Sequence, residues 1–125
     1  MGEVRTLFFD SYPFFEIIAG NENYGPYSEG VAIITTKMNL MELYYGLLHK
    51  YGKKQAEDYY DRFLEFCVEI SDDVIERACE FRLLLKNRDL SYVDCIGYVI
   101  AKFRGVRFLT GDEKFEDLEN VEYVK

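Results

Sequence analysis

Four acidic side chains, far apart in the sequence, occupy positions from which they could act together. Three of them come at or shortly after the ends of predicted strands, and the fourth lies in the first turn of a predicted helix. The acids at or after strand ends are Asp10, Glu42 and Asp112, and the acid in the helix is Asp94. In an open α/β sheet, ligands bind in the crevice outside the carboxyl ends of the strands. We therefore expect the four carboxylates to converge on one pocket.

Carboxylates gathered in this way need a cation. Two of them about 5 Å apart repel by roughly 3 kcal/mol at an effective dielectric constant of 20. Because the pattern offers only oxygen ligands, it favours Mg²⁺ or Mn²⁺ and not zinc. His49 is the only histidine and lies at the far end of its predicted helix, so neither a zinc site nor Ser/His/Asp or Cys/His catalysis is expected. The sequence also lacks a Gly-rich phosphate loop.

One or two such ions would suit the hydrolysis of a phosphodiester. A metal ion lowers the pKa of a bound water for in-line attack, and a second ion roughly 3.5–4 Å away stabilises the departing oxygen. Thr110 is a supporting candidate that could orient Asp112 or hold the attacking water. The basic side chains considered for phosphate contacts are Arg82, Lys86, Arg88 and Lys102.

Each acid also has a purely structural explanation. Asp10 could be a solvated turn residue before a helix that contains Pro13. Asp94 follows Ser91 by three residues, which is the spacing of a capping box, and Glu42 follows Asn39 in the same way. Asp112 could simply end a turn. The sequence leaves these alternatives open for every acid taken alone.

The elements that position the acids alternate between strands and helices. Short apolar strands are predicted at residues 4–10, 31–36, 67–70, 106–109 and 121–124, and amphipathic helices between them. A polar, turn-rich loop is predicted at residues 21–30. Parallel strands need helical crossovers, so this order indicates the α/β class: a three-layer α/β/α sandwich with a mainly parallel central sheet. Residues 1–125 are expected to form a single domain.

The composition bears on partners and compartment. The net charge of −8 is an argument against nucleic acid, because phosphate affinity comes largely from Lys and Arg, unless buried acids are neutralised by metal ions. The hydrophobic fraction of 49% is sufficient for a packed core, and no apolar run reaches the roughly 20 residues of a membrane span. Cys67, Cys79 and Cys95 lack metal-like spacing, which favours reduced thiols in a cytoplasmic protein.

Four segments, in the right order, carry a resemblance to a known family. They are residues 8–12 (FFDSY), 36–46 (TKMNLMELYYG), 90–94 (LSYVD) and 108–115 (FLTGDEKF). Over nearly its whole length the chain resembles PIN-domain proteins, and among them the VapC-type toxins and their archaeal relatives.

This resemblance implies a metal-dependent endoribonuclease that acts on RNA with Mg²⁺ or Mn²⁺. It implies metal-binding and catalytic roles for Asp10, Glu42, Asp94 and Asp112. Many relatives have an acid at the position of Lys114, and Asp117 is the candidate to replace it; an ordinary exposed acid is the alternative. The resemblance also implies a protein antitoxin and a homodimer as partners.

Two other functions remain open. A catalytically silent PIN-like binding module would explain the net charge of −8. A haloacid-dehalogenase-like phosphatase shares an Asp after the first strand and a late Gly-Asp pair followed by another Asp, which Gly111, Asp112 and Asp117 imitate. It needs a second Asp two residues after the first, where this chain has Tyr12.

Overall fold

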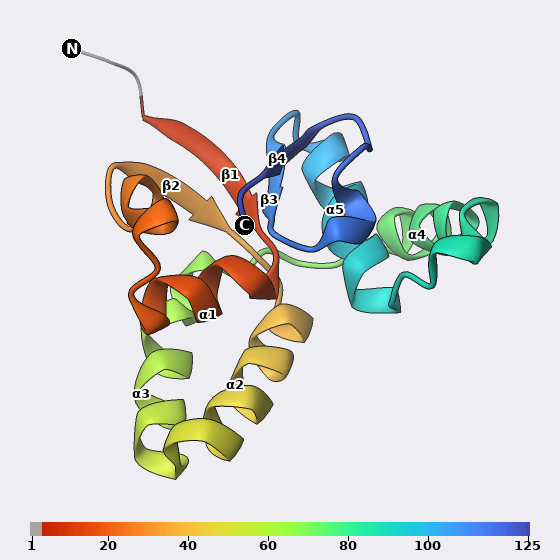
Figure 1. The fold of residues 1–125 in the computed structure, drawn as a ribbon. Coiled ribbons are helices and arrows are strands. Elements are labelled where there is room, and N and C mark those ends of the chain that lie inside the picture. The colour runs from red at the N-terminus through yellow and green to blue at the C-terminus, as the bar shows by residue number, and fades with distance from the viewer. Residues whose placement is uncertain (1–3) are drawn as a thin grey trace.

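The computed structural model describes residues 4–125, so residues 1–3 of the predicted domain lie outside the described residues (Figure 1). Its centre is a sheet of four parallel strands in the order β2-β1-β3-β4. The strands are β1 (Arg5–Phe9), β2 (Val31–Ile34), β3 (Arg107–Thr110) and β4 (Val121–Tyr123). The two central strands end next to each other, because Phe9 pairs with Leu109.

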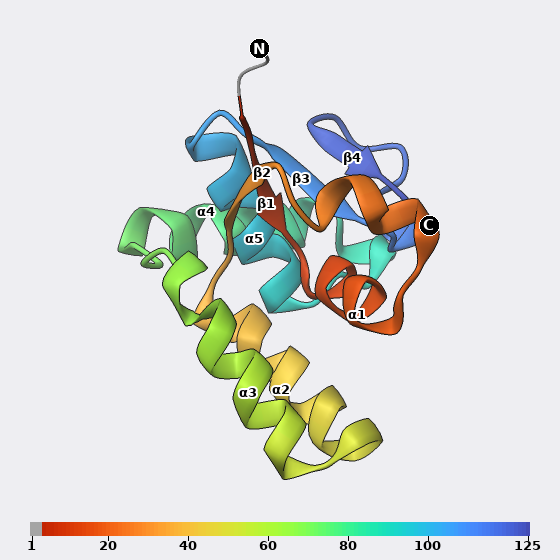
Figure 2. The ribbon, with the colours of Figure 1, turned by 90° about the vertical axis from the view of Figure 1, so that its left-hand side faces the viewer.

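Helices cover both faces of this sheet (Figures 1 and 2). On one face lie α4 (Asp72–Leu84) and α5 (Tyr92–Phe103); on the other lie α1 (Ser11–Ala19), α2 (Lys37–Tyr51) and α3 (Lys53–Phe63). The helices α2 and α3 form a hairpin that projects away from the sheet. None of the helices in residues 4–125 has both the length and the apolar character needed to cross a membrane. The predicted three-layer α/β fold is confirmed.

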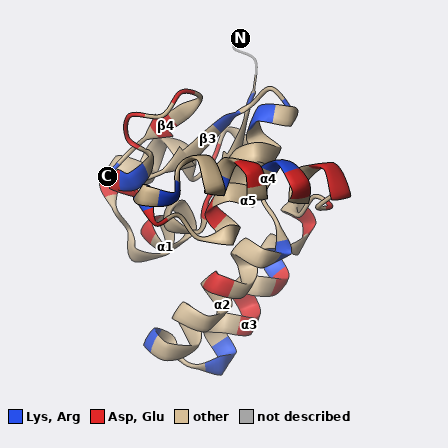
Figure 3. Ribbon diagram, turned by 90° about the vertical axis from the view of Figure 1, so that its right-hand side faces the viewer, with Lys and Arg blue, Asp and Glu red and all other residues tan. Residues whose placement is uncertain are grey.

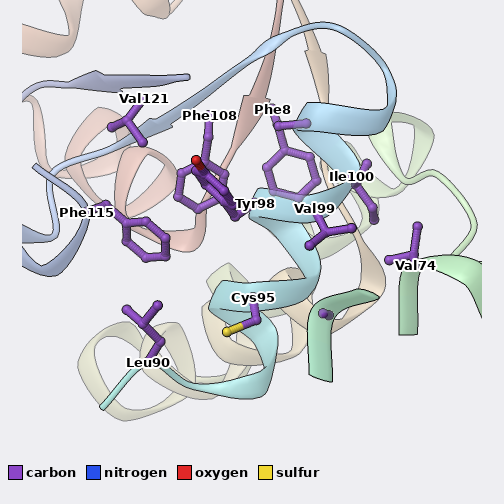
Figure 4. Packing of buried hydrophobic residues seen from close by; sticks show 12 residues of the cluster. Phe8, Val74, Leu90, Cys95, Tyr98, Val99, Ile100, Phe108, Phe115 and Val121 are labelled. Carbon is purple, nitrogen blue, oxygen red and sulfur yellow. The ribbon is translucent and has the colours of Figure 1, made fainter. Parts of the chain in front are cut away.

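Alternating side chains of the central strands supply two separate cores. Leu7 and Phe9 point to the α1–α3 side, whereas Phe8 points to the α4–α5 side. There Phe8 stacks on Phe108 with ring centroids 5.7 Å apart, and Phe108 contacts Phe115 at 4.8 Å (Figure 4). Burying one such side chain stabilises the fold by roughly 1.5–3 kcal/mol. Both central strands are therefore held rigidly from two sides.

A glycine lets α5 approach the sheet closely. A Cβ atom on Gly97 would lie 2.7 Å from Cε1 of Phe8 and 3.1 Å from Cε1 of Phe108, closer than packed atoms tolerate. Both rings are fully buried and cannot swing away. This contact places the first turn of α5, which contains Asp94, near the carboxyl ends of β1 and β3.

One predicted strand is wrong. Residues 67–70 make only an isolated bridge to the sheet, in which Cys67 pairs with Thr35. Val68 and Ile70 are apolar because they pack against the α4–α5 core, not because they extend the sheet. In the predicted loop at residues 21–30 there is a 3₁₀ helix, η1 (Glu22–Tyr27). Three further 3₁₀ helices are η2 (Leu64–Phe66), η3 (Lys86–Arg88) and η4 (Glu113–Phe115).

Candidate metal centre

The four predicted acids line one open pocket of about 470 Å³ at the carboxyl ends of the two central strands. Its walls come from the start of α1, the second turn of α2, the first turn of α5, the segment after β3 and the C-terminal residue after β4. The lining residues are Asp10, Ser11, Tyr12, Phe15, Glu42, Asp94, Gly111, Asp112, Glu113 and Lys125. A larger hollow of about 670 Å³ lies between α4 and α5, but it is mostly apolar and contains none of these acids. The chemistry therefore points to the smaller pocket.

Asp10 is the most buried of the four acids, with only 4% of its surface exposed. It occupies the cap position of α1 but makes no side-chain capping bond, so its role as a turn or cap residue is not observed. Instead, Thr110 donates its hydroxyl proton to Oδ2 of Asp10 over 2.8 Å. Burial, together with the charge of Asp94, raises the pKa of Asp10 to about 7, although the Thr110 bond lowers it.

Glu42 does not cap its helix either. The helix α2 begins at Lys37 and is capped by Thr36, so the spacing of Asn39 and Glu42 is not a capping box. Half-buried, Glu42 accepts a hydrogen bond from the Ser11 hydroxyl, with 2.7 Å between Oγ and Oε1. Burial raises its pKa, the Ser11 bond lowers it, and the charge of Asp94 raises it further.

Asp94 forms the capping box that its spacing with Ser91 predicts. Its Oδ2 accepts from the Ser91 backbone N–H at 3.0 Å, and the Ser91 hydroxyl accepts from the Asp94 N–H at 3.0 Å. Burial raises the pKa of Asp94 more than the bonds to Ser91 lower it, and the charge of Asp112 adds to the rise. Capping and pocket lining therefore coexist in one residue.

Asp112 is tied to the end of β3. Its backbone N–H donates to the Thr110 hydroxyl at 3.1 Å, and its Oδ1 accepts from the Lys114 N–H at 3.0 Å. The intervening Gly111 has no room for a side chain, since a Cβ atom would lie 2.5 Å from the Val124 carbonyl oxygen. Thr110 consequently connects two of the four acids, Asp10 and Asp112.

The other predicted site residues lie elsewhere. Asp117 does not line the pocket; it forms a two-pronged pair with Arg88 at 2.6 and 2.9 Å. Lys102 pairs with Glu119, and Arg82 donates to the Leu90 carbonyl.

Sequence reasoning missed Lys125, which lines the pocket and pairs with Glu113 at 3.0 Å. Its only signal in the sequence is the charge itself.

In Figure 3 acidic and basic residues are mixed over α4, and the hairpin of α2 and α3 is acidic in its middle and basic at its outer end.

The donor set of the pocket fits a hard divalent cation. It consists of carboxylate and hydroxyl oxygens, and burial and mutual charge raise the pKa values of Asp10, Glu42 and Asp94, which a nearby cation would lower. No three His, Cys, Asp or Glu side chains in residues 4–125 are already arranged as a metal-holding group. Each acid also accepts a hydrogen bond within the protein, from Thr110, Ser11, Ser91 or Lys114, and keeps further oxygen lone pairs for an ion.

The fold and the pocket define a class: α/β proteins with a parallel sheet flanked by helices and an acidic pocket where the central strands end. The model of the PIN-domain family matches residues 8–121. The chain therefore belongs to the PIN-domain family. Comparison with curated proteins gives no match.

Solved structures share this fold at low sequence identity. VapC20 of Mycobacterium tuberculosis, described as a sarcin-ricin loop cleaving toxin, has a TM-score of 0.78 and 20% identity, covering 95% of this chain and 99% of that one. A chain of a toxin-antitoxin complex from Klebsiella pneumoniae has a TM-score of 0.73 and 18% identity, and the match covers 93% of this chain and 95% of that one. The structure of VapBC2 from Rickettsia felis was solved with a DNA fragment from its promoter. Its matching chain has a TM-score of 0.72 and 20% identity, and the match covers 96% of this chain and 99% of that one.

Proposed function

We propose that the protein is a metal-dependent endoribonuclease that hydrolyses RNA phosphodiester bonds. The observation that carries this proposal is the pocket itself, in which four carboxylates from four parts of the chain meet at the end of a parallel sheet. Membership of the PIN-domain family and the similarity to a toxin that cleaves the sarcin-ricin loop support it. In this proposal Asp10, Asp94 and Asp112 hold Mg²⁺ or Mn²⁺, and Glu42 binds the ion directly or through water.

The side chains of the pocket divide the work. A divalent cation bound there supplies a Lewis acid for the attack of water on the phosphodiester. Thr110 holds Asp10 and the backbone of Asp112 in a fixed relation, and Ser11 orients Glu42. Lys125 lies at the rim of the pocket, where its ammonium group can contact an RNA phosphate once its ion pair with Glu113 is broken. Local contacts of this kind would suffice for a short RNA segment despite the net charge of −8.

Asp94→Asn is expected to lower Mn²⁺-dependent RNA cleavage by at least about 100-fold, because outer-sphere partners alone change metal sites 10–100-fold. An asparagine can still accept the bond from the Ser91 N–H, so the helix cap persists. Cleavage of a fluorescent single-stranded RNA and of an RNA hairpin, each with Mn²⁺ or with chelator, measures the effect. Asp117→Asn is the matched control outside the pocket and keeps full activity. Cleavage that persists in the presence of chelator contradicts the proposal, and so does undiminished cleavage by the Asp94→Asn variant.

The second candidate is a catalytically silent PIN-domain binding module. One observation favours it, the net charge of −8, because an acidic protein repels a polyanionic RNA on average. Saturable Mn²⁺ binding without cleavage of either RNA would select this function. The phosphatase alternative is wrong, because the chain belongs to the PIN-domain family and carries Tyr12 where the second Asp would be.

We further propose that the protein is the cytoplasmic toxin of a toxin-antitoxin pair, with a protein antitoxin and a second copy of itself as partners. Its support is the set of structural neighbours crystallised as toxin-antitoxin complexes. Large apolar side chains at the α4–α5 hollow are exposed, with Leu84 at 80% and Phe103 at 50%, and such a surface suits a homodimer. The mass of the purified protein in solution tests the homodimer.

A further inference from the structure

A chain of buried hydrogen bonds connects two of the acids from behind. Asn39 lies on α2 and is fully buried. Its Nδ2 donates to the Ser11 hydroxyl oxygen at 3.2 Å and, over a longer 3.5 Å, to Oδ1 of Asp10. Ser11 in turn donates to Glu42 at 2.7 Å. Asn39 therefore reaches one acid directly and the other through a single hydroxyl.

The orientation of the Asn39 amide is fixed by its neighbour Thr36. The Thr36 hydroxyl oxygen accepts from the Asn39 backbone N–H at 3.1 Å, and its proton is donated to Oδ1 of Asn39 at 2.7 Å. With Oδ1 occupied in this way, the NH₂ group must face Ser11 and Asp10. A flipped amide would direct an oxygen at a carboxylate and leave the Thr36 proton without an acceptor.

The hydrogen bonds therefore run from Thr36 through Asn39 to the acids: Asn39 donates to Asp10 and to Ser11, and Ser11 donates to Glu42. The single hydroxyl proton of Ser11 has two acceptors in reach, and Oε1 of Glu42 at 2.7 Å is closer than the Asn39 backbone carbonyl at 3.3 Å, so the bond to Glu42 is the shorter one. Ser11 lies at the start of α1, and Asn39 and Glu42 lie in the first two turns of α2. These hydrogen bonds therefore connect the end of β1 to α2. Buried polar groups with all partners present hold one geometry.

We propose that Asn39 is a positioning residue that sets the spacing and orientation of Asp10 and Glu42 for binding the divalent cation. This inference rests on the proposed metal site and adds a residue that holds its ligands. Asn39 itself touches neither substrate nor metal in this role. Side chains that orient metal ligands typically change metal affinity 10–100-fold when they are replaced.

Mn²⁺ titration followed by electron paramagnetic resonance tests the role without any RNA. Asn39→Ala is expected to weaken Mn²⁺ binding about 10-fold, and Ser11→Ala by a similar factor. Ser11→Thr keeps the hydroxyl and restores the affinity. The matched control is Thr35→Val, since Thr35 is also fully buried and donates to the Phe9 carbonyl at 2.9 Å, but it bonds to no acid. Its melting temperature falls while its Mn²⁺ affinity stays within about twofold of wild type.

The outcomes separate this inference from the proposed function. Wild-type Mn²⁺ affinity in Asn39→Ala, alongside weakened binding in Asp94→Asn, overturns the positioning role and leaves the metal site intact. An equal loss in Thr35→Val also overturns it, because the effect would then follow from stability alone. A wild-type protein that binds no Mn²⁺ overturns both. If Asn39→Ala does not fold, the comparison of Ser11→Ala with Ser11→Thr decides in the same way.

Discussion

Asp10→Asn is expected to raise the melting temperature of the metal-free protein at pH 8 and to abolish its stabilisation by Mn²⁺. Burial, with the charge of Asp94, raises the pKa of Asp10 from 3.8 to about 7 in the folded protein. The folded state thus holds a proton that the unfolded chain releases. This contribution to stability is complete below about pH 4 and is lost as the pH rises through 7. At 1.36 kcal/mol for each pKa unit, the loss is about 4 kcal/mol.

Thermal melting in chelator between pH 4 and 8 measures this effect. The wild type loses stability across that range, whereas Asp10→Asn has no proton to release and keeps more of it. Asp117→Asn is the control, because Arg88 lowers the pKa of Asp117, so its contribution to stability is complete above about pH 4 and is lost only at lower pH. This variant should therefore keep the pH dependence of the wild type between pH 4 and 8. If the melting temperatures of wild type and Asp10→Asn depend on pH in the same way, the pKa of Asp10 is not raised in the folded protein.

Thr110→Val is expected to weaken Mn²⁺ binding and RNA cleavage by about 10- to 100-fold while the protein stays folded. The Thr110 hydroxyl donates to Asp10 and accepts from the Asp112 backbone, and the side chain is fully buried. A hydrogen bond to a charged group contributes about 1.5–3 kcal/mol, and 1.4 kcal/mol corresponds to a factor of ten. Valine keeps the shape of threonine and removes only the hydroxyl.

The conservative variant Thr110→Ser distinguishes a lost hydrogen bond from lost packing. Serine restores the hydroxyl but lacks the methyl group, so Mn²⁺ affinity should return toward wild type while the melting temperature stays lower. The loss of the Asp10 bond also means that the pKa of Asp10 rises further in Thr110→Val, and its cleavage should need a higher pH. An unchanged pH profile and metal affinity in Thr110→Val would remove Thr110 from the site.

The positions of the acids could be predicted because they depend on topology. Apolar runs that end in Asp10 and just before Asp112 identify strand ends, and parallel strands bring such ends to one edge. The capping box at Asp94 is local and was equally readable. The similar spacing before Glu42 was misleading, since α2 begins earlier, at a threonine that the pattern did not identify as the cap.

What could not be predicted depends on contacts between distant segments. Ser11 and Asn39 are ordinary polar residues in the sequence, and their importance appears only when α1 and α2 meet. The apolar run at residues 67–70 suggested a strand because burial against α4 and α5 produces the same pattern as burial in a sheet. Likewise, charge alone could not tell that Arg88 is engaged by Asp117, outside the pocket, or that Lys125 lies at its rim.

A crystal of the protein soaked in Mn²⁺, with anomalous diffraction recorded, tests the metal site most directly. We expect an anomalous peak in the pocket at coordinating distance from carboxylate oxygens of Asp10, Asp94 and Asp112, with Glu42 beside it. The same soak of Asp10→Asn crystals should show a weaker peak or none. Manganese found only outside this pocket, or a pocket that stays without a peak at saturating Mn²⁺, would contradict the proposed metal site.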